Sequence, residues 1–210
     1  NRAAAERASF LAQEDRWWFT HTWFLDAALL GSLPPELQGL ADSISPEDWQ
    51  VIRQPLDFLA VNVYNGTQVD ERGEYIERIP GFPRTALKWP VTPQVMRYGP
   101  RWLYRRYRLP MYIAENGQSC NDRIFLDGRV HDPDRIDFLH RYLLELRECC
   151  AGGVPVKGYF HWSLTDNFEW HNGYDERMGL VYVHYPTQRR ILKDSAAWYA
   201  RTVRTNGRLL

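Results

Sequence analysis

The most informative segment of the chain is a nearly continuous apolar run, which reads Leu56-Asp57-Phe58-Leu59-Ala60-Val61-Asn62-Val63-Tyr64. A strand that is buried on both faces shows such a run, because neither of its faces meets water. The run therefore predicts a strand of a parallel sheet. Residues 109–114 and 156–164 have the same character and predict two more strands, and residues 181–183 predict a short one.

Helical patterns separate these strands. We expect helices over residues 15–30, from Ser45-Pro46 onward, from Thr92-Pro93 to about residue 107, over 134–150 and over 195–205. Two helices show clear inward positions, namely Trp18, Phe19, Trp23, Phe24, Ala27 and Leu30 in the first, and Ile136, Leu139, Leu143 and Leu146 in the fourth. Strands that alternate with helices at this spacing favour right-handed βαβ units, so the fold class is α/β with a parallel sheet.

The composition excludes several classes of protein. The 210 residues include 26 Lys and Arg and 26 Asp and Glu, so the formal net charge is zero. A nucleic-acid binder is expected to carry a basic surface, and we therefore expect no nucleic-acid partner. The apolar runs are too short for a membrane-spanning helix of about 20 residues or for a secretory signal, so we expect no membrane association.

The three cysteines, Cys120, Cys149 and Cys150, show neither Cys-x-x-Cys spacing nor a histidine at metal-ligand spacing. We interpret them as thiols in a reducing compartment. Together with the neutral charge and the lack of a leader sequence, they favour a cytoplasmic protein without a metal or another cofactor. The first residue is Asn rather than Met, which suggests that other residues precede it.

Polar and aromatic residues gather where the predicted strands end, which is where parallel sheets bind ligands. Taken singly, each has an ordinary explanation: Glu115-Asn116-Gly117 resembles a turn, a lone tryptophan is usually core, and Asp166-Asn167 resembles a helix cap. Taken together, carboxylates, indoles, an amide and a phenol suit a sugar. Indoles stack on its apolar CH faces, polar groups bind its hydroxyls, and a carboxylate can attack its anomeric carbon.

Two motifs at these strand ends resemble a known family. They read Met111-Tyr112-Ile113-Ala114-Glu115-Asn116-Gly117 and Gly158-Tyr159-Phe160-His161-Trp162-Ser163-Leu164-Thr165-Asp166-Asn167-Phe168-Glu169-Trp170. Over about residues 10–205, the chain resembles the retaining β-glycosidases of glycoside hydrolase family 1, although Ala114 stands where Thr is more usual. The resemblance implies that residues 1–210 form the carboxy-terminal portion of a single TIM (β/α)8 barrel domain, about three βα units corresponding to strands 6 to 8.

The resemblance also implies catalytic roles. Glu115 matches the nucleophile that forms a covalent glycosyl-enzyme. Tyr64 would donate a hydrogen bond to this carboxylate and so tune its charge and orientation. Asn62 would lie beside the same sugar subsite.

Further positions match sugar contacts of the family. Glu169 would bind two hydroxyls of the non-reducing sugar, Trp170 would donate to another hydroxyl, and Trp162 would form a platform under the ring. Trp89 would line the leaving-group subsite, and the long loop over residues 65–90 would shape its entrance. Met178 stands at the upper wall of the pocket, where the family commonly has an aromatic residue. Because Glu169 would repel a sugar phosphate, unphosphorylated β-glycosides are the expected substrates.

One part of the expected machinery is missing from the sequence. Retaining hydrolysis uses two carboxyl groups about 5 to 5.5 Å apart, and the family's second one lies in an Asn-Glu-Pro motif that these 210 residues lack. Three parallel strands also cannot close a barrel. We therefore expect a β-glucosidase-like hydrolase that is inactive as an isolated chain and needs an amino-terminal half of the barrel as a separate chain or missing segment.

Two alternatives remain open from the sequence. The chain could be a catalytically incomplete carbohydrate-binding or regulatory relic of the same fold, or a half-barrel module with a structural role only. Labelling by an activated fluoroglycoside would separate them, because only a working nucleophile forms the covalent adduct.

Overall fold

The structure is a computed structural model that describes residues 1–16 and 18–210. Its chain contacts define two compact units. The first unit comprises Asn1–Leu59, Thr67–Arg78 and Tyr98–Pro110, and the second comprises Ala60–Gly66, Ile79–Arg97 and Met111–Leu210. We describe each unit by itself. The prediction that the chain forms part of one barrel domain stays a prediction.

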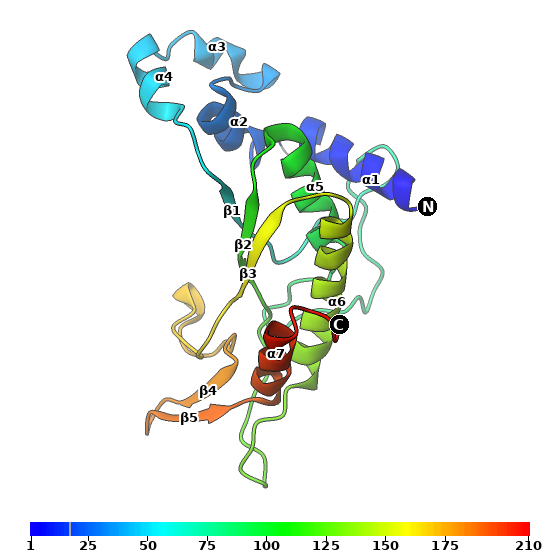
Figure 1. Ribbon diagram of the computed structural model, residues 1–210, viewed down its shortest axis with the longest axis vertical. Coiled ribbons are helices and arrows are strands. Elements are labelled where there is room, and N and C mark those ends of the chain that lie inside the picture. The colour runs from blue at the N-terminus through cyan, green and yellow to red at the C-terminus, as the bar shows by residue number, and fades with distance from the viewer. Residues whose placement is uncertain (17) are drawn as a thin grey trace. The chain divides into compact units, whose positions relative to one another are not determined.

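A sheet of three strands carries the predicted strand ends. Its order is β1 (Leu59–Asn62), β2 (Met111–Asn116) and β3 (Val156–His161), and the three strands lie side by side (Figure 1). β2 and β3 are parallel, with Met111 opposite Val156, which confirms the parallel pairing predicted for these two strands. β1 is shorter than the predicted strand, and Phe58, just before it, is exposed.

A second, two-stranded sheet follows in the chain. β4 (Val181–His184) pairs antiparallel with β5 (Arg189–Leu192), so that Val181 lies opposite Leu192. The sequence analysis predicted β4 but missed β5. Two consecutive arginines, Arg189 and Arg190, begin this strand, so it lacks the apolar run by which the other strands were predicted.

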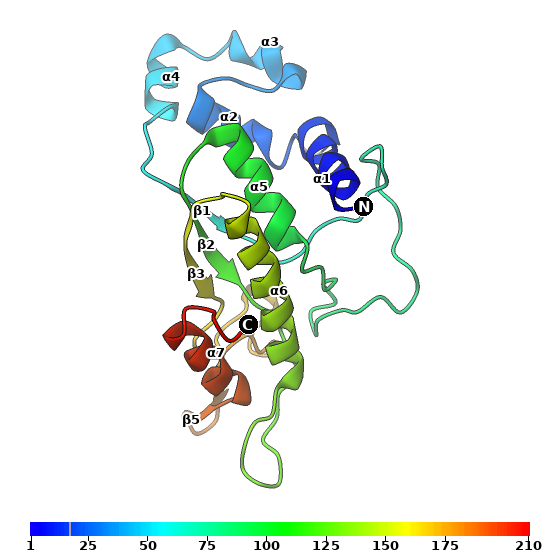
Figure 2. The same cartoon turned by 45° about the vertical axis from the view of Figure 1, so that its right-hand side comes forward.

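The helices of the second unit largely match the predictions. α6 (Pro133–Ala151) runs beside the sheet, and α7 (Asp194–Arg204) packs against α6 (Figure 2). Leu139, Leu143 and Leu146 are buried on α6 as predicted, and Ile136 is half-buried. A short 3-10 helix, η3 (Trp170–Asn172), follows the loop after β3. Residues 65–90 form neither a helix nor a named strand.

The first unit is mostly helical. Its elements are α1 (Arg2–Leu11), the π-helix η1 (Ala12–Arg16), α2 (Thr22–Leu30), the 3-10 helix η2 (Pro35–Leu37), α3 (Gln38–Ala41) and α4 (Pro46–Ile52). Most of α5 (Val95–Tyr107) also belongs to it. The Ser45 side chain accepts a hydrogen bond from the Asp48 amide and caps α4, which confirms the predicted helix start.

The helix predicted over residues 15–30 is wrong in its first half, because α2 begins only at Thr22. Residue 17 lies outside the described residues. Gly31 ends α2 with a φ of 70°, as expected for a helix-ending glycine. The predicted apolar face is wrong as well, since Phe24 is 63% exposed. α2 buries Asp26 instead, whose carboxylate accepts hydrogen bonds from the Arg106 guanidinium and the Tyr107 hydroxyl.

Among the described residues, no helix combines the length and the apolar character needed to cross a bilayer.

Candidate active site

The ends of β1 and β2 bring a tyrosine and a glutamate into direct contact. The Tyr64 hydroxyl donates a hydrogen bond to Glu115 Oε2 over 2.7 Å. The backbones are also joined here, because the Val63 N–H donates to the Glu115 carbonyl oxygen over 2.9 Å. The strand pairing therefore fixes the backbones on which the phenol and the carboxylate meet.

Tyr64 also links this contact to a second carboxylate. Burial raises the pKa of Tyr64 above its usual range, the hydrogen bond to Glu115 raises it further, and the charges of Glu115 and Glu169 add to the effect. The phenol therefore stays protonated at neutral pH and remains a donor. The charges of Glu115 and Glu169 therefore both reach the Tyr64 hydroxyl, although only Glu115 accepts its hydrogen bond.

Glu169 lies in the loop after β3, where its N–H donates to the Gly173 carbonyl oxygen over 2.7 Å. Its Oε2 atom is buried and accepts no hydrogen bond from the part of the chain that the structure describes. A buried carboxylate oxygen without a donor is costly, and a ligand hydroxyl could supply that donor. Trp170 follows directly and is 77% exposed.

The other aromatic residues predicted for the site occupy different environments. Trp162 is half-buried, and its backbone N–H donates to the Asn116 backbone carbonyl oxygen over 2.9 Å. The peptide bond between Trp162 and Ser163 is cis. Trp89 is half-buried and meets the Tyr64 ring edge-on, with ring centroids 5.2 Å apart.

Two further predicted site residues, Asn62 and Met178, differ in their exposure, and the role of Asn62 stays a prediction. Asn62 ends β1 and is exposed. The Met178 side chain is only 1% exposed, so it presents almost no surface to a ligand, and the expectation that it walls the pocket gains no support. Its backbone carbonyl accepts from the Ser163 N–H over 3.2 Å instead.

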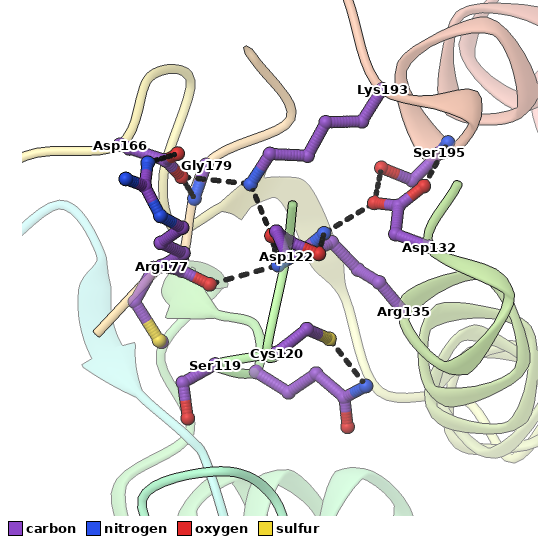
Figure 3. Close-up of polar contacts among 12 residues, drawn as sticks. Ser119, Cys120, Asp122, Asp132, Arg135, Asp166, Arg177, Gly179, Lys193 and Ser195 are labelled. Carbon is purple, nitrogen blue, oxygen red and sulfur yellow. Dashed lines mark hydrogen bonds and ion pairs between the residues drawn. The ribbon is translucent and has the colours of Figure 1, made fainter. Parts of the chain in front are cut away.

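A buried network of charged side chains lies in the second unit (Figure 3). Lys193 Nζ bridges two carboxylates, lying 2.5 Å from Asp122 Oδ2 and 2.7 Å from Asp166 Oδ1. The other members are Arg135, which pairs with Asp122 and Asp132, Arg177, which pairs with Asp166, and Ser195, which donates to Asp132. Lys193, Arg135 and the three aspartates are almost completely buried.

This network ties the loop after β3 to the rest of the second unit. Asp166 lies three residues before Glu169 and, besides Lys193, accepts the Gly179 N–H over 3.0 Å. A side chain at residue 179 would not fit, because its Cβ would lie 2.2 Å from the Asp166 nitrogen. Loss of one partner in such a network leaves a buried charge unpaired. The sequence analysis missed the network, although Lys193 and Asp166 both lie in segments that it matched to the family.

His161, at the end of β3, is neutral in the folded protein. Burial, reinforced by the charge of Arg135, lowers its pKa to about 3. Nε2 lies 3.3 Å from the Met178 carbonyl oxygen, and Nδ1 is buried without a hydrogen-bond partner among the described residues. His161 therefore does not carry protons near neutral pH.

In the described part of the chain, no three His, Cys, Asp or Glu side chains are grouped so that they could hold a metal ion. Cys120, Cys149 and Cys150 are all free thiols.

These features agree with comparisons to known proteins. Residues 3–208 match the family described as glycosyl hydrolase family 1, and the chain belongs to this family. Beta-glucosidase A of Thermotoga maritima is 38% identical over 195 residues, which cover 88% of this chain and 43% of that protein. Thermostable beta-glucosidase B of Thermobispora bispora is 41% identical over 199 residues, covering 88% and 41%.

A solved structure shows the same relation. The beta-glucosidase from Thermotoga maritima in complex with glucoimidazole superposes with a TM-score of 0.78 at 39% sequence identity, covering 88% of this chain and 44% of that one. The chain thus spans less than half the length of the relatives that it matches, and its fold corresponds to part of a family 1 TIM barrel.

Proposed function

We propose that this chain is the carboxy-terminal part of a β-glucosidase-like hydrolase that cleaves unphosphorylated β-glycosides with retention. The observation that carries the proposal is the hydrogen bond that the Tyr64 hydroxyl donates to Glu115 over 2.7 Å. The charge of Glu169 also contributes to the raised pKa of this hydroxyl. The charge effect of Glu169 on the same hydroxyl supports a sugar-binding carboxylate in the neighbourhood of the nucleophile. The names of the relatives, which are β-glucosidases, support the substrate class.

Glu115 is the proposed nucleophile. Tyr64 occupies its Oε2 atom, which leaves Oε1 to attack the anomeric carbon. As the new bond between Oε1 and the anomeric carbon forms, the bond to the leaving-group oxygen breaks and that oxygen takes a proton from a general acid. Water then attacks the anomeric carbon of the glycosyl-enzyme, gives its proton to the same group acting as a base, and releases Glu115.

Glu169 and two tryptophans are the proposed sugar contacts. The unpartnered Oε2 atom of Glu169 suits a donating hydroxyl, and the exposed Trp170 indole leaves its N–H open to another. Trp162 would stack on the apolar face of the ring. The negative charge of Glu169 disfavours a phosphorylated sugar in this place.

The general acid has to come from outside these 210 residues. The sequence holds no Asn-Glu-Pro motif, and the chain covers only 43% of the Thermotoga maritima relative. We propose that an amino-terminal segment, in the same polypeptide or in a separate one, supplies the acid, further sugar contacts and the remaining barrel strands. The isolated chain is then inactive toward unactivated glycosides.

The test is complementation. The chain is co-expressed with the part of Thermotoga maritima beta-glucosidase A that precedes the matched region, and hydrolysis of a β-glucoside is measured. We expect activity from the pair and none from either part alone. Glu115→Gln should abolish this activity, whereas Glu47→Gln, at an exposed position of α4, should not change it.

Two results would contradict the proposal. Full activity in a single purified band of 24.8 kDa would show that no other segment is needed. An assembled pair that binds glucose analogues without turnover would favour a carbohydrate-binding or regulatory relic instead.

A further inference from the structure

Asn116 follows Glu115 at the end of β2, and its side chain joins all three strands of the sheet. The residue is completely buried. Its Nδ2 donates to the Val63 carbonyl oxygen over 2.7 Å, just beyond the end of β1. Its Oδ1 accepts from the Tyr159 hydroxyl on β3 over 2.8 Å. One amide therefore uses both of its ends to connect β2 with its two neighbours.

The Asn116 backbone makes a further connection at the same level of the sheet. Its carbonyl oxygen accepts the Trp162 N–H over 2.9 Å. The next residue, Gly117, passes so close to Trp162 that an added Cβ would lie 2.0 Å from the Trp162 carbonyl oxygen. Residues 116 and 117 are thus held against the end of β3, and a side chain at residue 117 would push this segment away from Trp162.

The contact with Val63 bears on the proposed catalytic pair. The Val63 N–H is held by the Glu115 carbonyl oxygen, and the Val63 carbonyl oxygen is held by Asn116 Nδ2. Val63 is therefore held on both sides by consecutive residues of β2. Because Tyr64 is the next residue, this double hold fixes where its side chain leaves the backbone and so where its hydroxyl meets Glu115.

We propose that Asn116 is a positioning residue, whose amide holds the Val63 carbonyl so that the Tyr64 hydroxyl reaches Glu115 and orients that carboxylate for attack. The catalytic consequence rests on the proposed function. The geometric part, from Asn116 through Val63 to the Tyr64 contact, does not, and it can be measured without any turnover.

The experiment measures the ¹³Cζ chemical shift of Tyr64 at neutral pH by nuclear magnetic resonance of labelled tyrosine in the full chain, because this shift responds to hydrogen bonding of the hydroxyl. The Tyr64 signal is assigned from Tyr64→Phe. Asn116→Leu removes both side-chain hydrogen bonds at similar volume, and Asn116→Ser is a smaller change that also cannot reach Val63. Tyr159→Phe is the matched control, because it removes only the Oδ1 contact and leaves the hold on Val63 intact.

We expect the Tyr64 ¹³Cζ resonance to move toward the position of a solvent-exposed tyrosine in both Asn116 variants, because the hydroxyl loses its contact with the carboxylate. In Tyr159→Phe the resonance should stay close to its wild-type position. An unchanged Tyr64 resonance in both Asn116 variants would overturn the proposal. Global unfolding of both variants would also overturn it, since Asn116 would then serve the fold as a whole.

A second readout separates this proposal from the proposed function. In the complemented protein, a 2-fluoro-glucoside with a dinitrophenyl leaving group should label wild type, and the Asn116 variants should react roughly 10- to 100-fold more slowly with similar sugar affinity. No labelling of wild type, combined with a shifted Tyr64 resonance in the Asn116 variants, would reject the hydrolase and keep the positioning role. Normal labelling of the Asn116 variants would reject the catalytic role of the positioning.

Discussion

The ends of β2 and β3 carry the two carboxylates of the candidate site, and they are held in different ways. At the end of β2, Glu115 already has a hydrogen-bond partner in Tyr64. In the loop after β3, Glu169 has a buried oxygen without a partner among the described residues, and Trp170 is open to solvent. The β2 side therefore already has its hydrogen bond in the absence of a ligand, whereas the β3 side has polar groups that are still open to one.

The difference extends to the forces that hold each side. Hydrogen bonds between neighbouring strands fix Glu115, and a buried charge network fixes the loop of Glu169 through Asp166. Strand pairing is maintained by many backbone contacts, so the stability of the sheet tolerates the loss of one side-chain hydrogen bond, even where that bond positions a neighbouring residue. A charge network depends on each of its members, because one deletion leaves a buried charge without compensation. The comparison predicts that single substitutions on the β3 side lower the free energy of unfolding more than single substitutions on the β2 side.

The largest expected effect is on stability, from Lys193→Met. This change removes the cation between Asp122 and Asp166 and should lower the free energy of unfolding by about 3 to 5 kcal/mol. Urea unfolding of the chain measures it. Lys157→Met, at an exposed position of β3, is the control and should change stability by less than about 0.5 kcal/mol. Equal stabilities of the two variants would mean that the network does not hold the β3 side.

Glu169→Gln tests the β3 side directly, because Glu169 is its proposed sugar contact. If Glu169 binds two sugar hydroxyls, loss of its charge should weaken glucose-analogue binding by roughly 10- to 100-fold, since hydrogen bonds to charged groups contribute about 1.5 to 3 kcal/mol. The complemented protein is titrated calorimetrically. Glu176→Gln, in the same loop region, serves as the control. Unchanged affinity of Glu169→Gln would remove Glu169 from the sugar site.

The sheet and the long helix were predictable from the sequence because they follow simple periodic rules. The apolar run around Val61 marks a strand, although Leu59 is the one buried residue of β1, and the spacing of Leu139, Leu143 and Leu146 marks the buried face of α6. The pairing of Tyr64 with Glu115 was also predicted, but through a family resemblance, since 51 positions separate the two residues.

The errors arose where tertiary contacts outweigh local pattern. α2 begins at Thr22 and buries Asp26, because a paired carboxylate can take a buried place that a pattern assigns to apolar residues. Buried charges such as Lys193 look like surface charges in a sequence, so the network could not be predicted from composition. β5 was missed for a different reason, since its exposed Arg189 and Arg190 leave it without the apolar run that marks the other strands.

Acid should lower the stability of the folded protein through His161, at the end of β3. Its pKa in the folded protein is about 3, against a usual 6.5, so between these values the unfolded chain binds a proton that the folded chain does not. Stability therefore falls as the pH drops below 6.5, by about 2 kcal/mol between pH 6.5 and 5. Melting temperatures of wild type and His161→Gln across this range measure the effect. His171→Gln, at an exposed position, should retain the wild-type slope, and a wild-type slope in His161→Gln would contradict the assignment.

A smaller effect of opposite sign is expected from His131, just before α6. Its two ring nitrogens lie 2.5 Å from Asp194 Oδ2 and 2.9 Å from Asp127 Oδ2. These hydrogen bonds raise its pKa in the folded protein, with Asp194 the larger cause. The added stability is complete below pH 6.5 and is lost as the pH rises through the folded pKa. A melting series from pH 6 to 9 should show this loss in wild type and not in His131→Gln.

The central claim is that Glu115 attacks the anomeric carbon, and mass spectrometry of the trapped intermediate tests it most directly. The complemented protein is incubated with the 2-fluoro-glucoside, digested and mapped. We predict one added fluoroglucosyl group on the peptide that contains Glu115, and none in Glu115→Gln. A label on another carboxylate, or sugar binding without any covalent label, would contradict the claim.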